Sequence, residues 1–565
     1  MDEHRLYLYD TVMAGRYGEL GDPMRGLMMD MPLLITSLIQ FAAQYHGDTE
    51  IVSRSVEGPV RRTTYGQVFA RAQKLANALT AYGIQSGDRV ATLAWNTDLH
   101  LELYYAVSGI EAVCHTVNLR LGDEELIYII NHAEDRILFF DLDLAETVDR
   151  IASKLTTVER YVVMTGPDHM PARIPDNTVA YETLIGEESE RFAWPTFNEN
   201  TAASMCYTSG TTGKPKGVLY SHRSTVLHAM ASCYASTLDL RTHDVVLPVV
   251  PMFHVNAWGV PYSAPIAGAP LVMPGPKLDG ENLFNLMDVE GVSIALGVPT
   301  VWMGLLDHMD VVGRKPNGFD RVIIGGAAAS ETIIDRFEMD HGVKVHHAWG
   351  MTEMSPIGVV NTLKPKFSDM SRKEQMPIKV KQGRIVYGVD MRIVDDAGSI
   401  IPNDGQSSGR LHVRGPWIVD TYFKADESAL TEDGWFDTGD IATLDADGYM
   451  HITDRAKDII KSGGEWISSV GLENAAIAHP AIKLAAVIGI PHPKWQERPL
   501  LICVAEKGEE LPSLAQVKAF LSDQVPKLWL PDALEWVDEL PLGATGKILK
   551  ADLRSSYADY TLPGK

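Results

Sequence analysis

The chain has 565 residues, of which 45% are hydrophobic, and its 74 acidic and 50 basic side chains give a formal net charge of −24. A chain this acidic offers no basic footprint for a nucleic-acid backbone and is poorly matched to an anionic membrane surface. It contains no apolar run long enough to span a bilayer, and its acidic N-terminus is unlike a secretory signal, so we expect a cytoplasmic protein without a membrane span.

Strand and helix patterns alternate through the first two thirds of the chain. Residues 89–95 (RVATLAW) are typical of a buried strand, and apolar residues follow at helical spacing over 101–113. Further short apolar runs predict strands at 136–142, 160–165, 245–250, 293–298, 321–324 and 343–347. Such alternation predicts βαβ units, in which parallel sheets are covered on both faces.

The composition then becomes rich in glycine and aspartate over residues 383–455. Short apolar runs joined by Asp-Gly turns predict a compact β-rich subdomain there. The junction at 454–462 is charged and then Gly-rich, which is the composition expected of a hinge.

The last hundred residues have a third pattern, with two expected helices at 471–478 and 513–524 and two expected strands at 485–490 and 500–505. We therefore predict a large N-terminal domain (1–456) and a small α+β C-terminal domain (457–565), with the hinge near Lys457.

The strongest chemical signal is the segment 207–218 (YTSGTTGKPKGV). Its three glycines let backbone N–H groups approach an anion, its hydroxyls add donors, and Lys214 and Lys216 add positive charge. It is not a Walker A loop, because Gly213-Lys214 is followed by Pro215 and position 208 is threonine. The segment predicts a phosphate-binding loop of another kind.

This loop resembles the signature of the acyl-adenylate-forming superfamily, and the resemblance extends from about residue 34 to residue 550. It is closest to bacterial medium- and long-chain fatty acyl-CoA ligases and to methylthiopropanoate–CoA ligases. The resemblance implies a multi-domain α/β fold, with two αβ-type subdomains, a β-barrel-like subdomain and a small mobile α+β C-terminal domain.

The same resemblance implies ATP-dependent ligation of a carboxylic acid to coenzyme A through an acyl-AMP intermediate, with Mg²⁺ as cofactor. A medium-chain fatty acid is the leading candidate, and methylthiopropanoate or a long-chain fatty acid is the alternative. A non-catalytic nucleotide- or acyl-binding protein is disfavoured, because Lys547 and Glu353 are both present. The resemblance also implies a homodimer, because the family's fatty acyl members are often dimers.

Residue roles follow from the resemblance. Lys547 would be the adenylation lysine, Glu353 and Thr208 would hold Mg²⁺, and Thr352 and Lys461 would assist catalysis. His254, Val255, Trp258 and Gly325 would form the acyl pocket and its gate, and Gly463, Gly464, Glu465 and Trp466 the CoA tunnel. The other residues expected to bind nucleotide are Ser209, Gly210, Thr211, Thr212, Gly213, Lys214, Lys216, Gly326, Ala327, Ala328, His347, Ala348, Trp349, Gly350, Met351, Asp440, Arg455 and Lys457.

Composition alone leaves simpler interpretations open for several of these segments. Residues 253–258 could be a packed aromatic corner, and 324–328 (IGGAA) a strand-end turn. Trp349 stands where the family more often has tyrosine, so the stacking face is kept but a hydroxyl is lost.

Overall fold

The computed structural model describes residues 27–208, 214–463, 465–542 and 548–562. The predicted site residues Ser209, Gly210, Thr211, Thr212, Gly213, Gly464 and Lys547 therefore lie outside the described residues. The fold described below belongs to the unit Leu33–Lys565.

A seven-stranded sheet organises the N-terminal part, with strand order β7-β6-β5-β3-β4-β8-β9. Its ladders are parallel except for the antiparallel pair β8–β9. The strands are β3 (Arg89–Leu93), β4 (Val113–Thr116), β5 (Asp135–Phe140), β6 (Arg160–Val163), β7 (Thr178–Ala180), β8 (Ala202–Tyr207) and β9 (Gly217–Ser221).

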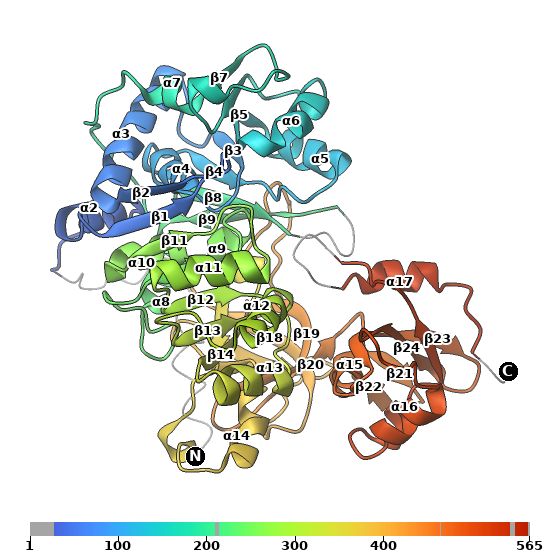
Figure 1. Cartoon of the computed structure of the whole chain (residues 1–565). Helices are drawn as coiled ribbons and strands as arrows, with labels where there is room; N and C mark the ends of the chain where they lie inside the picture. Colours follow the sequence, from blue (N-terminus) through green and yellow to red (C-terminus); the bar gives the residue numbers. More distant parts are fainter. Residues whose placement is uncertain (1–26, 209–213, 464, 543–547, 563–565) are drawn as a thin grey trace. The chain divides into compact units, whose positions relative to one another are not determined.

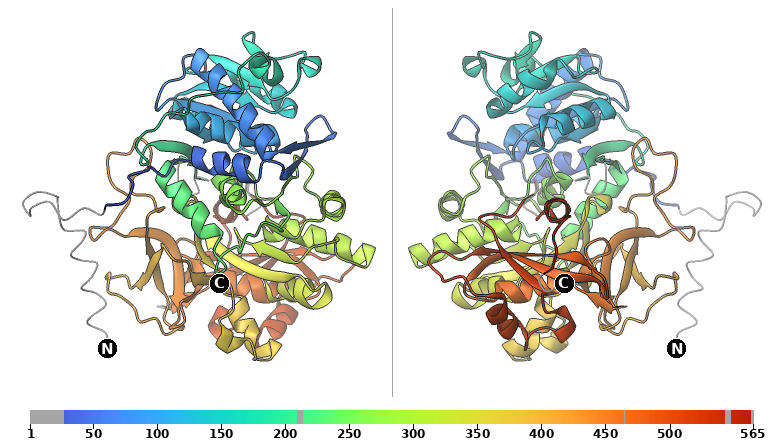
Figure 2. Two further views of the ribbon diagram at one scale, coloured as in Figure 1. Left: turned by 90° about the vertical axis from the view of Figure 1, so that its left-hand side faces the viewer. Right: turned by 90° about the vertical axis from the view of Figure 1, so that its right-hand side faces the viewer.

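Helices cover both faces of this sheet, as the alternating pattern predicts (Figures 1 and 2). Along β3, Val90 faces one hydrophobic core and Ala91 and Leu93 the other. The first core contains α3 (Tyr65–Ala81) and α4 (Asp98–Gly109), and the second α5 (Asp123–Ala133) and α6 (Ala145–Ala152).

One sequence expectation needs correction here. The helical spacing over 101–113 does not mark one helix, because α4 begins at Asp98 and ends at Gly109. Glu111 then adopts a left-handed backbone (φ 68°), and Val113 already belongs to β4. Both elements contribute buried apolar residues, so the apolar pattern continues across the short turn and hides the boundary between them.

A second sheet of 13 strands has the order β17-β18-β19-β20-β16-β15-β14-β13-β12-β10-β11-β1-β2. From β11 through β14 neighbouring strands are parallel, and from β14 to β17 they are antiparallel. The antiparallel half contains the predicted β-rich region, since β16 to β20 lie within residues 383–455.

The strands of this sheet are β1 (Glu50–Arg54), β2 (Val60–Thr64), β10 (Val246–Pro248), β11 (Leu271–Met273), β12 (Ile294–Gly297), β13 (Arg321–Ile324), β14 (Lys344–Gly350), β15 (Ile357–Val360), β16 (Gly383–Ile385), β17 (Asp390–Val394), β18 (Gly409–Arg414), β19 (Phe436–Leu444) and β20 (Tyr449–Arg455). Helices associated with these two parts of the chain also include α2 (Thr36–Tyr45), α7 (Tyr181–Ile185), α8 (His222–Ser232), α9 (Val255–Trp258), α10 (Val260–Ala267), α11 (Gly280–Glu290), α12 (Pro299–Val312), α13 (Glu331–Asp335) and α14 (Arg372–Lys379).

The C-terminal residues form a separate five-stranded sheet with its own hydrophobic cores. Its elements are β21 (Ile460–Ser462), β22 (Glu465–Ile467), α15 (Ser469–Ile477), β23 (Ile482–His492), β24 (Gln496–Ala505), α16 (Leu514–Leu521), β25 (Ala533–Trp536) and α17 (Lys550–Ser556). This is the α+β content expected of that region. Among the described residues, no helix is both long and apolar enough to cross a membrane.

Candidate active site

The phosphate-loop segment emerges between two antiparallel strands. β8 leads into it, β9 leaves it, and Tyr207 pairs with Gly217 across the ladder. The neck is closed by Thr208, whose N–H donates to the Lys216 carbonyl (2.9 Å) and whose hydroxyl accepts from the Lys216 N–H (3.2 Å). A strand and not a helix follows Pro215, which agrees with the exclusion of a Walker A loop.

Both lysines of the loop lie over tyrosine rings. Lys214 Nζ is 4.9 Å from the ring centre of Tyr128, and Lys216 Nζ is 4.6 Å from that of Tyr422. These are cation–π distances, at which the ring face attracts the ammonium group. Each ammonium group is therefore held by a contact with a residue outside the loop segment.

The end of β14 brings three predicted nucleotide-binding residues together. Trp349 Nε1 donates to Asp440 Oδ2 (3.0 Å), and Arg455 Nε lies 3.2 Å from Asp440 Oδ1. Asp440 and Arg455 are direct partners in the β19–β20 ladder, which sets this pairing. Asp440 is only 4% exposed, so β19 places a largely desolvated carboxylate beside the indole N–H of Trp349.

Glu353 follows β14 in a short turn and is also buried. Burial raises the pKa of its carboxyl, and the hydroxyl of Tyr422 donates to its Oε1 (2.9 Å). Its neighbour Thr352 is fixed through its carbonyl, which accepts from Tyr220 Oη (2.7 Å).

The surroundings of Glu353 fit a magnesium ion that arrives with a nucleotide. A carboxylate deprived of water gains most from a nearby cation, and Mg²⁺ in nucleotide sites takes few protein oxygens because phosphates supply the rest. Within the described residues there is no cluster of three or more potential metal ligands, and such a cluster is not needed for this kind of site.

The loop after β13 lies against the predicted gate. A Cβ atom at Gly325 would lie 2.8 Å from Trp258 Cη2 and 3.1 Å from the Ala348 carbonyl, so only glycine allows this approach. The ring of His347 accepts from the Ala329 N–H (3.3 Å), which holds the loop to β14. Burial lowers the pKa of His347 to about 4, so the ring is neutral and can accept that bond at pH 7.

Val255 and Trp258, two residues predicted to form the acyl pocket and its gate, lie in a left-handed turn. Val255, Asn256, Ala257 and Trp258 have φ angles of 46°, 50°, 48° and 55°. Such angles are rare for residues other than glycine, and four in succession require support from contacts elsewhere. Asn256 supplies them, because its amide donates to Ser204 Oγ (3.1 Å) and its carbonyl oxygen accepts from Tyr104 Oη (3.2 Å).

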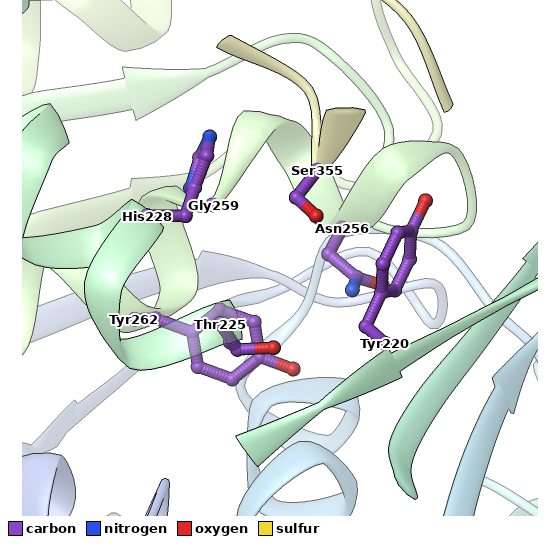
Figure 3. Close-up of a pocket in the computed structure, with 7 residues that line it drawn as sticks. All are labelled: Tyr220, Thr225, His228, Asn256, Gly259, Tyr262 and Ser355. Atoms are coloured by element: carbon purple, nitrogen blue, oxygen red, sulfur yellow. The ribbon is translucent and has the colours of Figure 1, made fainter. Parts of the chain in front are cut away.

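A small cavity opens beside this turn, with about 10 Å³ of free space, roughly what one water needs. Figure 3 shows its lining residues, which are Tyr220, Thr225, His228, Asn256, Gly259, Tyr262 and Ser355.

The cavity has one buried hydroxyl without a hydrogen-bond partner among the described residues, that of Tyr262. On its other side, the Ile357 N–H donates to His228 Nε2 (3.2 Å), and burial lowers the His228 pKa to about 3, so the proton of the neutral ring sits on Nδ1. A space of this size is suited to a single water that accepts from the Tyr262 hydroxyl.

The predicted C-terminal site residues lie on different elements. Lys461, Glu465 and Trp466 belong to the β21–β22 hairpin, and the Lys461 N–H donates to Glu497 Oε2 (2.9 Å). Gly463 needs its glycine, with φ 62° and the Trp495 ring 2.6 Å from where a Cβ would be. Lys457 lies in the turn between β20 and β21.

The structure adds residues that sequence reasoning missed, above all Tyr422 and Tyr220. Both carry hydroxyls that bond to the Thr352–Glu353 pair. Tyr422 lies in an irregular segment between β18 and β19, where no spacing or composition marks it. Tyr220 lies within β9, where a tyrosine is likewise ordinary in sequence, so only the fold reveals either one.

Comparison with known proteins identifies the family that this chain matches and several proteins of similar sequence. The model of the AMP-binding enzyme family matches residues 39–423, and that of the AMP-binding enzyme C-terminal domain matches residues 471–547. A 3-methylmercaptopropionyl-CoA ligase of Ruegeria lacuscaerulensis is 53% identical over 538 residues, covering 95% of this chain and 99% of that protein.

Two further proteins span the same length. A medium-chain-fatty-acid–CoA ligase of Ectopseudomonas oleovorans is 51% identical, over 95% of this chain and 98% of that protein. The crystal structure of ATP-bound MatB from Rhodopseudomonas palustris is 27% identical, with a TM-score of 0.78 over 94% of this chain and 99% of that one.

Proposed function

The chain belongs to the AMP-binding enzyme family and is an AMP-forming acyl-CoA ligase, and we propose how its residues divide that work. The observation that supports the proposal most directly is that Lys216 of the phosphate loop and the buried Glu353 carboxylate contact the same side chain, Tyr422. The Lys216 ammonium, which would bind phosphate, and the Glu353 carboxylate, which would bind the metal ion, thereby share one neighbouring side chain.

The first half-reaction joins two anions. A substrate carboxylate must attack the α-phosphate and displace pyrophosphate, so the site has to cancel charge as the bond forms. In our proposal Lys214 and Lys216 neutralise the outer phosphates, Asp440 takes the ribose hydroxyls, and Trp349 stacks on adenine. Lys547, which lies outside the described residues, would bridge the carboxylate and the α-phosphate.

Glu353, with the hydroxyl of Thr208, would hold Mg²⁺. When bound, that ion supplies positive charge to the triphosphate oxygens. The Tyr422 hydroxyl donates to the Glu353 carboxylate, and the Tyr220 hydroxyl donates to the adjacent Thr352 carbonyl. These contacts keep the acidic residue in place before any ligand arrives.

The second half-reaction passes the acyl group from AMP to the thiol of CoA. We propose that the domain boundary lies at 456/457 and that rotation about Lys457 exchanges Lys547 for residues 463–466 at the site. The position of Lys457 in a turn between two sheets supports this hinge. Lys461 and the hairpin it belongs to would then line the CoA path.

Two acids lead the candidates, with a long-chain fatty acid as the alternative. A medium-chain fatty acid is supported by the 51% identical relative, whereas a short acid with a heteroatom, such as 3-methylthiopropanoate, is supported by the 53% identical one. Both relatives cover 95% of this chain, so the choice between these acids is made by experiment.

The activity test is the release of AMP and pyrophosphate from ATP and Mg²⁺, with and without CoA, across acids of two to sixteen carbons. Formation of ADP and phosphate with every acid would refute the proposal. Lys547→Ala should lose adenylation by roughly 10²–10³-fold, the cost of removing one preorganised charge-stabilising group. Normal pyrophosphate exchange in that variant would contradict the role of Lys547.

The candidate acids are distinguished by comparing pentanoate with 3-methylthiopropanoate. The two acids have the same chain length, and sulfur replaces one CH₂ in the second. If the short thioether acid is the substrate, kcat/KM favours 3-methylthiopropanoate over pentanoate. Octanoate exceeding both by an order of magnitude would instead support the medium-chain candidate.

A further inference from the structure

We propose that Tyr422 is the positioning residue that couples the phosphate loop to the metal-binding carboxylate. Its ring contacts the Lys216 ammonium group, and its hydroxyl donates a hydrogen bond to Glu353. The inference rests on the proposed roles of those two residues. It adds a third residue, from a part of the chain far from both in sequence, which sets their relative placement.

The backbone around Tyr422 is attached to both partners. The Val419 N–H donates to the Glu353 carbonyl (2.8 Å), and the Phe423 N–H donates to the Gly217 carbonyl (2.8 Å), next to Lys216. The segment 419–423 therefore bridges the turn after β14 and the start of β9. Tyr422 lies between these two attachment points, so its side chain has a defined place relative to each.

The approach at the second attachment point is close. A Cβ atom at Gly217 would lie 3.0 Å from Phe423 Cβ and 3.3 Å from Tyr207 Cζ. The last glycine of the phosphate-loop segment thus allows the bridging segment to rest directly on the loop's exit strand. Any displacement of 419–423 would be transmitted to the loop.

The chemistry of the side chain suits both contacts. An ionised carboxylate can only accept a hydrogen bond, so the phenol of Tyr422 is the donor in its contact with Glu353. The carboxylate accepts this hydrogen bond at 2.9 Å, while the ring face stays available to the Lys216 ammonium at 4.6 Å. A neutral donor here orients the carboxylate without cancelling the charge that a cation needs.

Two substitutions separate the contacts. Tyr422→Phe keeps the ring under Lys216 but removes the bond to Glu353, and Tyr422→Leu removes both. ATP binding is measured by calorimetry without Mg²⁺ and over a series of Mg²⁺ concentrations, so the readout does not depend on turnover. Formation of acyl-AMP is followed separately.

For Tyr422→Phe we expect ATP affinity without Mg²⁺ to stay within about twofold of the parent, because the cation–π contact remains. The Mg²⁺ concentration that half-saturates the ATP complex should rise roughly tenfold or more, since bonds to charged groups are the strong ones. For Tyr422→Leu, ATP affinity without Mg²⁺ should fall as well, by about two- to thirtyfold.

Tyr449→Phe is the matched control. Its hydroxyl also lies in the antiparallel half of the large sheet, donating to the Thr362 carbonyl (2.9 Å) and accepting from the Lys364 N–H (3.0 Å), away from Lys216 and Glu353. It should lower the melting temperature at least as much as Tyr422→Phe and leave the Mg²⁺ series unchanged.

An equal Mg²⁺ shift in Tyr449→Phe, or no shift in Tyr422→Phe, overturns the proposal. So does a Tyr422→Leu protein that binds metal-free ATP as well as the parent. If these results come from proteins that still form acyl-AMP, the positioning role fails while the proposed function stands. If the parent forms no acyl-AMP, it is the proposed function that fails.

Discussion

Asp440 offers the sharpest test of the nucleotide site. Its two oxygens accept from Trp349 Nε1 (3.0 Å) and pair with Arg455 Nε (3.2 Å), and the residue is 4% exposed. Each carboxylate oxygen can accept two hydrogen bonds, so ribose hydroxyls can share them with these two side chains. Asp440→Asn keeps the shape but replaces one acceptor oxygen by an NH₂ donor.

The expected loss follows from the number of bonds affected. One hydrogen bond to a charged group contributes about 1.5–3 kcal/mol, which corresponds to roughly 10–150-fold in the ATP dissociation constant. The amide also lacks the charge that attracts Arg455 and cannot accept on both sides, so the loss should lie in the upper half of that range.

The assay compares ATP with 3′-deoxy-ATP in the parent and in Asp440→Asn by calorimetry. If Asp440 takes the ribose hydroxyls, deletion of the hydroxyl weakens binding to the parent and has little further effect in the variant. Asp437→Asn is the control, because Asp437 lies on the same strand but pairs with Arg410 (2.6 Å). Equal sensitivity of parent and Asp440→Asn to the missing hydroxyl would refute the assignment.

Three further substitutions test other parts of the molecule. Gly325→Ala should impair adenylation at least roughly tenfold because its methyl group meets Trp258 and the Ala348 carbonyl, and adding Trp258→Phe should restore part of the activity; no rescue would mean that the ring contact is irrelevant. Lys457→Pro should spare adenylation far more than thioester formation, and equal loss of both would argue against the hinge. Burial raises the pKa of Glu473 to about 7 from an ordinary 4.5, so its contribution to stability is complete below pH 4.5 and declines as the pH rises to 7. The decline in melting temperature between pH 5 and 7.5 should therefore be shallower for Glu473→Gln than for the parent, and parallel curves would contradict the shifted pKa.

Much of the fold follows from local patterns, because strands buried on both faces are continuous apolar runs. Expected strands at 89–95 and 321–324 correspond to β3 (Arg89–Leu93) and β13 (Arg321–Ile324). The same property misleads where a helix and a strand are both buried, as in α4 and β4. Apolar content reports burial, and only length and turn residues separate the two kinds of element.

The sequence predicts the separate segments of the candidate site but not the contacts between them. Glycine spacing marks the phosphate loop, but nothing local shows that Trp349 donates to Asp440, 91 positions away. That contact depends on the register of β19 and β20 and on their place beside β14, which are properties of the whole sheet. Tyr422 is hidden for the same reason, since its partners come from two other segments.

The left-handed turn at residues 255–258 connects the proposed acyl gate to the proposed ATP site through a side-chain hydrogen bond. Each non-glycine residue in this conformation costs about 1–2 kcal/mol, so the turn would revert to right-handed geometry if its restraints were cut. The chief restraint is Asn256, anchored on Ser204 of β8, the strand that leads directly into the phosphate loop. The strained backbone that carries Trp258 is thus restrained by the strand that leads into the proposed ATP site. A displacement of either the turn or β8 would therefore change the position of the other.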